Sequence, residues 1–79
     1  MIFEQMISLP SIESVHKFHK AICKINCDVD LVTQNMRYTI DAKSIMGIFS
    51  LDLSKPVILK VYSDDPKVIS KVKDILQSL

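Results

Sequence analysis

Four residues that can bind metal ions or act as nucleophiles lie close together in the first third of the sequence, namely His16, His19, Cys23 and Cys27. An α-helix turns about 100° per residue and would place them on one narrow stripe, where imidazole and thiolate groups can bind zinc. The stripe follows the edge of an apolar helix face, and no second segment supplies a closing ligand. Cysteine at such an edge usually behaves as a small apolar residue, so we predict no metal site and no cofactor.

The helix that would carry these groups is predicted over residues 12–25. Ser11 directly precedes it, where a serine hydroxyl can accept a free backbone N–H of the first turn. His16 would lie more than one turn into the helix and would miss the N-terminal N–H groups that stabilise a bound phosphate. The apolar residues recur at spacings of three and four and form one stripe, which consists of Ile12, Val15, Phe18, Ile22 and Ile25.

An N-terminal strand is expected over residues 2–8, but the sequence leaves its buried face open. Phe3 and Ile7 would point to one side of the strand. Ile2 and Met6 would point to the other side, so a shift of one residue would exchange the two faces.

Two alternating runs, over residues 28–33 and 36–41, favour a β-hairpin. Gln34 and Asn35 stand between them and can form the turn, because asparagine tolerates a positive φ. In the second run, every other residue is apolar, and we expect Met36, Tyr38 and Ile40 to share one face.

Three further elements complete the predicted order. Ser44 is placed to cap a short helix over residues 45–51, and a strand over residues 57–63 follows Pro56. An Asp-Asp-Pro sequence then starts a last helix over residues 66–78. The apolar residues expected to be buried in that helix are Val68, Ile69, Val72, Ile75, Leu76 and Leu79.

The resulting order is βαββαβα, in which all strand pairs can be antiparallel. We therefore predict an α+β fold of two layers, a four-stranded antiparallel sheet with three helices on one face. With 79 residues, the sequence predicts one domain over residues 1–79.

Composition and charge exclude several classes of function. Hydrophobic residues make up 48% and charged residues 24% of the chain, as in globular domains. A net charge of +1 gives no strong attraction to nucleic acid or anionic lipid. No apolar run approaches the roughly 18 residues of a membrane span, and no secretory signal is expected. We predict a cytoplasmic protein that binds neither nucleic acid nor membrane.

The segment over residues 42–51, Ala-Lys-Ser-Ile-Met-Gly-Ile-Phe-Ser-Leu, resembles the serine-site segment of HPr proteins from Gram-positive bacteria, which commonly read K-S-I-M-G-x-M-S-L there. Eight of those nine positions match when x is free. Upstream, the Asp-Val-Asp-Leu run over residues 28–31 is similar to a D-V-x-L strand of the family. The resemblance covers essentially the whole chain, and it implies the HPr-like open-faced sandwich of the same βαββαβα order.

The resemblance also implies what is missing. HPr proteins carry a phosphoryl group on a histidine at the start of the first helix, within an H-x-R-P-A motif. An ungapped count from Asp28 places Ser11 at the histidine position, Glu13 at the arginine position and Ser14 at the proline position. A serine phosphate is a stable ester, and Glu13 would repel a phosphate. The chain therefore has no predicted catalytic residue and is not expected to be an enzyme.

Two kinds of site are implied by the resemblance. In relatives with this motif, a dedicated kinase phosphorylates the serine that corresponds to Ser44, and a phosphate there meets free N–H groups. Exposed apolar residues of the same helix form the family's docking surface, and here Met46 and Phe49 are expected to be more exposed than Ile45 and Ile48. The implied partner-binding residues are Met46, Gly47, Phe49 and Leu51.

Together these features predict a monomeric, non-catalytic regulatory or adaptor protein that is related to the sugar phosphotransferase system and acts through the Ser44 helix. Its expected partners are proteins of the phosphotransferase or catabolite-control system, including an HPr kinase. Two alternatives stay open: a phosphocarrier HPr of sugar transport, and a relic of the fold that serves an unrelated protein interaction. Leu9 and Asp52 stand where the family commonly has glycine, and with Glu13 they favour the last reading.

Overall fold

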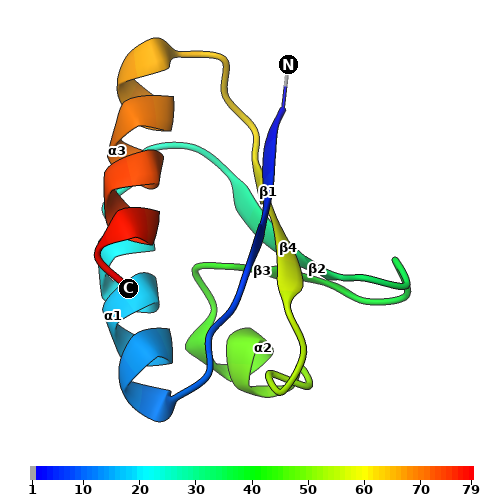
Figure 1. The fold of residues 1–79 in the computed structure, drawn as a ribbon. Helices are drawn as coiled ribbons and strands as arrows, with labels where there is room; N and C mark the ends of the chain where they lie inside the picture. The colour runs from blue at the N-terminus through cyan, green and yellow to red at the C-terminus, as the bar shows by residue number, and fades with distance from the viewer. Residues whose placement is uncertain (1) are drawn as a thin grey trace.

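The computed structural model describes residues 2–79 and has the element order βαββαβα. The strands form one antiparallel sheet in the spatial order β1-β4-β2-β3. Figure 1 shows α1 and α3 side by side on one face of the sheet, with α2 near the end of β3. This is the predicted α+β architecture. The elements are β1 (Phe3–Ile7), α1 (Ile12–Ile22), β2 (Val29–Thr33), β3 (Thr39–Asp41), α2 (Ile45–Phe49), β4 (Val57–Val61) and α3 (Pro66–Gln77).

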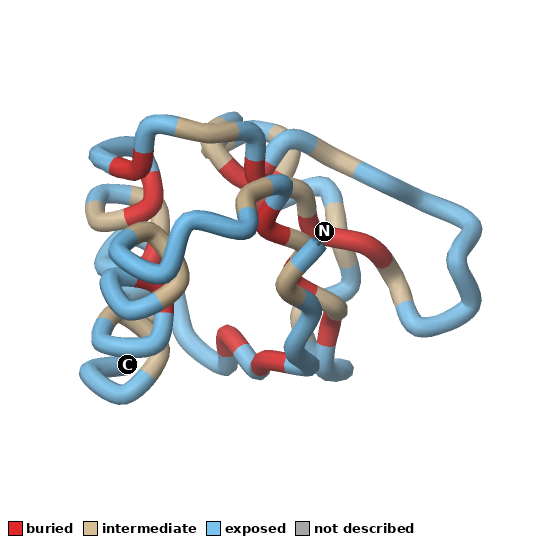
Figure 2. Tube along the Cα trace, turned by 90° about the horizontal axis from the view of Figure 1, so that it is seen from above, coloured by how far each residue is buried: buried red, intermediate tan, exposed pale blue. Residues whose placement is uncertain are grey.

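The hydrophobic core lies between the sheet and the helices (Figure 2). Alternate residues of the two central strands point into it, and each helix contributes fully buried side chains. Among residues 2–79, no buried side chain is polar or charged, so the core is held by apolar packing alone. The most deeply buried large side chains include Phe18, Ile22, Leu31, Ile48, Leu59 and Val72.

The structure settles which face of β1 is buried. Ile7 pairs with Val57 and is buried, whereas Met6 pairs with Ile58 and is 56% exposed. Phe3 shares the side of Ile7 and packs against the core. The pairing with β4 fixes this choice, because the alternating residues of β4 already bury Val57.

Helix α1 is shorter than predicted and ends at Ile22, with Cys23 as its C-cap. Ile25 is buried as expected, but it lies in the turn that follows the helix. Ile12, which the sequence analysis placed in the apolar stripe, is 69% exposed. At about 100° per residue, Ile12 stands about 80° around the helix from Ile22, so it falls outside the buried stripe.

The β2–β3 hairpin differs from the prediction at its tip. Strand β3 starts at Thr39, and both Met36 and Tyr38 are exposed, because they belong to the loop. The positive φ falls on Met36, at 60°, and not on Asn35. The Asn35 side-chain oxygen instead accepts hydrogen bonds from the Thr33 hydroxyl at 2.6 Å and from the Arg37 backbone N–H at 3.0 Å.

The remaining elements begin where the sequence predicts, but α2 ends at Phe49 in place of residue 51, β4 at Val61 in place of residue 63, and α3 at Gln77 in place of residue 78. Asp65 caps α3 by accepting the Lys67 backbone N–H at 2.9 Å, and Pro66 is the first helical residue. The prediction that Leu79 is buried was wrong, since it lies beyond the end of the helix and is 39% exposed. None of the helices formed by residues 2–79 has both the length and the apolar character that crossing a membrane requires.

Candidate functional site

The N-terminus of α2 is built around Ser44, which has an extended backbone and is exposed. Its hydroxyl oxygen accepts the Gly47 backbone N–H at 3.2 Å, as the sequence predicted for a cap. The preceding turn is fixed by the Asp41 carboxylate, which accepts the Lys43 N–H at 2.9 Å. A Cβ at position 47 would lie 3.3 Å from the Ser44 hydroxyl oxygen, so glycine allows this close approach.

Helix α2 separates a buried side from an exposed side. Ile48 is fully buried, and Ile45 is partly buried against the core. Met46 is 79% exposed and Phe49 is 42% exposed. The predicted order of exposure is confirmed, because a helix of five residues can turn only one side toward the sheet.

Three contacts hold α2 and the turn before it against α1 and the turn after it. The rings of His16 and Phe49 meet edge to face, with centroids 5.8 Å apart. One turn further along α1, the His19 Nε2 atom donates a hydrogen bond to the carbonyl oxygen of Lys43, at 2.9 Å. In return, the Lys43 ammonium donates to the carbonyl of Ile25 at 2.6 Å, just beyond the end of α1.

These contacts divide the stripe of four candidate ligands. His16 faces Phe49, whereas the Cys23 sulfur lies 3.3 Å from the Nε2 atom of His19. Nowhere within residues 2–79 do three or more His, Cys, Asp or Glu side chains gather as a metal site would require. Cys27 is half-buried, and this desolvation raises the pKa of its thiol. The positive charge of the nearby Lys43 lowers that pKa and offsets part of the rise.

The start of α1 is occupied by a reciprocal serine cap. The Ser11 hydroxyl oxygen accepts the Ser14 backbone N–H at 3.0 Å, and the Ser14 hydroxyl oxygen accepts the Ser11 N–H at 3.1 Å. Glu13 lies exposed in the first turn, where a carboxylate interacts favourably with the helix dipole. The residues counted to the family's histidine, arginine and proline positions therefore serve as helix-capping and first-turn residues.

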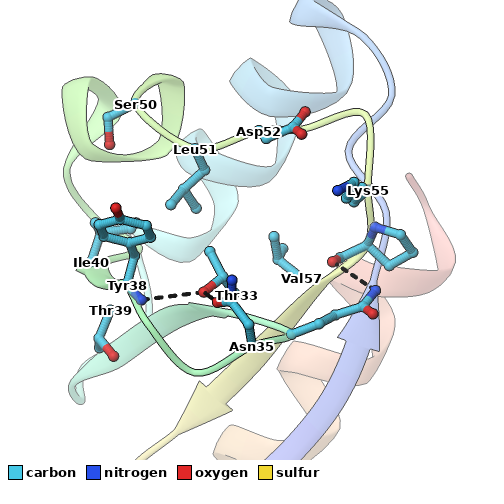
Figure 3. A pocket seen from close by; sticks show the side chains of 12 residues that line it. Thr33, Asn35, Tyr38, Thr39, Ile40, Ser50, Leu51, Asp52, Lys55 and Val57 are labelled. Atoms are coloured by element: carbon cyan, nitrogen blue, oxygen red, sulfur yellow. Dashed lines mark hydrogen bonds between the residues drawn. The ribbon is translucent and has the colours of Figure 1, made fainter.

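Sequence reasoning did not predict the cleft between the β2–β3 hairpin and the loop from α2 to β4, which has a volume of about 810 Å³. Figure 3 shows Tyr38 on one side of it and Asp52 and Lys55 on the other. Asp52 is held by Ser54, whose hydroxyl and N–H hydrogen bonds lower the pKa of the Asp52 carboxyl. The lining residues are Thr33, Gln34, Asn35, Tyr38, Thr39, Ile40, Ser50, Leu51, Asp52, Lys55, Pro56 and Val57.

The cleft and the exposed side of α2 are joined at the end of the helix. Leu51, which was predicted as a partner-binding residue, lies in the turn after α2 and lines the cleft. It is partly buried against the core, so it supports the surface more than it presents a free side chain. The sequence contains little that predicts the cleft, because the residues of its two walls are far apart in the chain.

Comparison with known proteins identifies the fold. No protein-family model matches the sequence, and no curated protein matches it significantly. Among solved structures, the chain is similar to the crystal structure of HPr-C-His from Thermoanaerobacter tengcongensis, with a TM-score of 0.72. The match covers 99% of this chain and 92% of that chain, at 24% sequence identity. The chain therefore has an HPr-like fold.

Proposed function

We propose that this chain is a non-catalytic regulatory or adaptor protein that binds other proteins through α2. The observation that carries the proposal is the exposure of Met46 and Phe49, at 79% and 42%, on a short helix whose other side is buried at Ile48 and partly buried at Ile45. Methionine adapts to different surfaces, and aromatic residues are common anchors of interfaces. We define the α2 surface as Met46, Gly47, Phe49 and Leu51.

The residues at the start of α1 argue against a phosphoryl carrier. A carrier needs an imidazole nitrogen there, because phosphoimidazole passes its phosphoryl group onward and a serine ester does not. Ser11 and Ser14 are engaged in the helix cap, and Glu13 adds a negative charge beside them. A phosphoryl group at this position would meet like charge instead of an arginine.

Ser44 is the proposed regulatory site of the α2 surface. Its side chain is exposed, and its segment resembles the serine site at which HPr proteins are phosphorylated. A phosphate there would add about −1.5 to −2 charges beside Met46, which changes the partner that this surface accepts. The proposed partners are proteins of the phosphotransferase or catabolite-control system, with a kinase of the HPr-kinase type as the modifying enzyme.

The second candidate is a phosphocarrier of sugar transport. It is favoured by the nearly complete structural overlap with HPr-C-His. The imidazoles of this chain, His16 and His19, instead contact Phe49 and the Lys43 carbonyl. A carrier role would have to release one of these rings from its contact.

A capture experiment with purified partners tests the adaptor proposal. The immobilised chain is offered HPr kinase and catabolite-control proteins, as wild type and as Met46→Asp. Met46→Asp should abolish capture, whereas Met36→Asp, the same change at an exposed methionine of the hairpin tip, should keep it. Equal capture by both variants would show that α2 is not the binding surface.

Phosphorylation is tested in the same system. Incubation with HPr kinase and ATP should add an acid-stable phosphate to the wild type and none to Ser44→Ala. The wild type should then bind a different set of the offered proteins from the unmodified chain. Labelling that persists in Ser44→Ala would place the modification elsewhere.

A further inference from the structure

Within the described residues, no helix or strand covers the face of the sheet opposite the helices (Figure 1). Strand pairing places Met6 beside Ile58 and Ile58 beside Val32 on this outer face. Met6 is 56% exposed, whereas Val32 is only 2% exposed between its neighbours. These three residues form an apolar row across the sheet.

A charged row runs beside the apolar row. The pairing Glu4–Lys60–Asp30–Asp41 crosses all four strands. The Lys60 ammonium lies 3.7 Å from a carboxylate oxygen of Glu4. Among the described residues, no salt bridge joins Asp30 or Asp41 to a cation, although Lys60 is the cross-strand neighbour of Asp30.

At the edge of the charged row is a small hollow beside Tyr62. The backbone N–H of Tyr62 donates to the backbone carbonyl of Asp28 at 3.0 Å, which brings Asp28 to the same end of the face. Tyr62 is 41% exposed, and the pKa of its hydroxyl is raised, first by a hydrogen bond with Asp30 and then by burial and the nearby carboxylates. The hollow has a volume of about 220 Å³ and is lined by Asp28, Val29, Asp30, Asp41 and Tyr62.

The charge of this face differs from the charge of the molecule. The face carries four carboxylates, on Glu4, Asp28, Asp30 and Asp41, against the single ammonium of Lys60, whereas the whole chain has a net charge of +1. A second copy of the chain docked face to face would bring the two negative surfaces together, which is unfavourable. The complementary occupant is cationic and has apolar side chains for Met6 and Ile58, the accessible residues of the apolar row.

We propose that the outer sheet face binds a basic segment of a partner protein. One lysine or arginine side chain of the segment lies in the hollow lined by Asp28, Asp30 and Asp41, where it donates a charge-assisted hydrogen bond to a carboxylate and meets the Tyr62 ring. Neighbouring apolar side chains of the segment cover Met6 and Ile58. This surface is separate from the α2 surface, so the chain can hold two partners at once.

The test is an NMR titration of the ¹⁵N-labelled chain with a synthetic peptide of alternating lysine and valine. Amide signals of Met6, Ile58, Lys60 and Tyr62 should shift, and the affinity should fall as salt is added. Asp30→Asn/Asp41→Asn should weaken binding by about tenfold or more, because charge-assisted hydrogen bonds are lost. The asparagine at position 41 keeps an acceptor for the Lys43 N–H, so the turn is preserved.

Matched control variants show whether the peptide binds at the outer face itself. Asp52→Asn/Asp74→Asn changes the net charge equally away from the face and should leave the affinity unchanged. Met46→Asp should also leave it unchanged, so failure of the α2 surface and failure of this site are distinguishable. The proposal is overturned by no binding, by equal binding of a glutamate–valine peptide, or by shifts confined to α1 and α2. It is also overturned if magnesium chloride alone shifts the same signals, or if the chain dimerises through this face.

Discussion

Ser11 shows how one residue type changes the chemistry of a helix start. The sequence predicted its capping role, because serine before an apolar helical stripe is a strong N-cap signal. The reciprocal bond from Ser14 was not predicted, since the usual capping box has glutamate or glutamine at that position. The cap leaves the first turn of α1 ordered without any imidazole, which is the residue-level basis of our proposal that the chain is not a phosphoryl carrier.

Ser44 should contribute measurably to stability through its cap. Ser44→Ala removes the acceptor of the Gly47 N–H and should lower the free energy of unfolding by about 1 kcal/mol. Ser44→Asn supplies another capping oxygen and should retain most of that energy. Urea unfolding of the three proteins measures the difference, and equal loss in both variants would show that the hydroxyl does not act as a cap.

Met36 combines a side chain that has a Cβ atom with a positive φ, which is a conformation that favours glycine. Its φ of 60° is left-handed, and its side chain is 58% exposed, so little packing offsets the strain. We expect Met36→Gly to raise the free energy of unfolding by about 0.5–1 kcal/mol, because the cost of a left-handed Cβ exceeds the entropy cost of glycine. Met36→Ile should lower the melting temperature. A lower melting temperature in Met36→Gly would contradict this account of the hairpin.

The two cysteines should differ in reactivity and in their effect on pH stability. Cys23 is exposed, whereas burial raises the pKa of the half-buried Cys27, so iodoacetamide at neutral pH should label Cys23 first. A raised pKa in the folded state means that the folded chain holds this proton more strongly than the unfolded chain. The free energy of unfolding should therefore fall as the pH rises past 9.0, the ordinary pKa of a cysteine thiol. Cys27→Ala should remove this part of the pH dependence. Mass spectrometry and pH-dependent urea unfolding check both parts, and faster labelling of Cys27 would contradict them.

At the scale of elements, the apolar patterns identified the faces of the helices better than their ends. The stripe of α1 was correct for Val15, Phe18 and Ile22, but the end of the helix was placed three residues too late. Ile25 continues the apolar spacing and is buried, so the pattern alone did not reveal that the backbone had already left the helix.

The α2 surface should be separable from the core of the same helix. Met46→Asp replaces a side chain that is 79% exposed and should change the melting temperature very little. Ile48→Ala leaves a cavity at a fully buried position and should cost about 2–5 kcal/mol. Thermal unfolding compares the two variants, and unfolding of Met46→Asp would show that this side of α2 belongs to the core.

At the scale of the whole molecule, the order of elements and the antiparallel sheet were predictable, because alternating and helical apolar patterns follow one another with clear turn residues. The cleft was not predictable, because its walls come from residues 33–40 and 50–57, which only the tertiary fold brings together. The charged row on the outer face of the sheet was not predictable for the same reason. Its charged row combines four strands whose pairing the sequence does not specify.

The chain has an HPr-like fold, and we propose that it lacks carrier chemistry. The most direct test incubates the protein with phosphoenolpyruvate and enzyme I, beside an active HPr as the positive control, and measures acid-labile phosphate by mass spectrometry and acid treatment. We expect the control to be phosphorylated and this chain to stay unmodified, because Ser11 stands at the histidine position and Glu13 at the arginine position. Stoichiometric acid-labile phosphate that disappears in His16→Ala or His19→Ala would contradict the claim and establish a phosphocarrier.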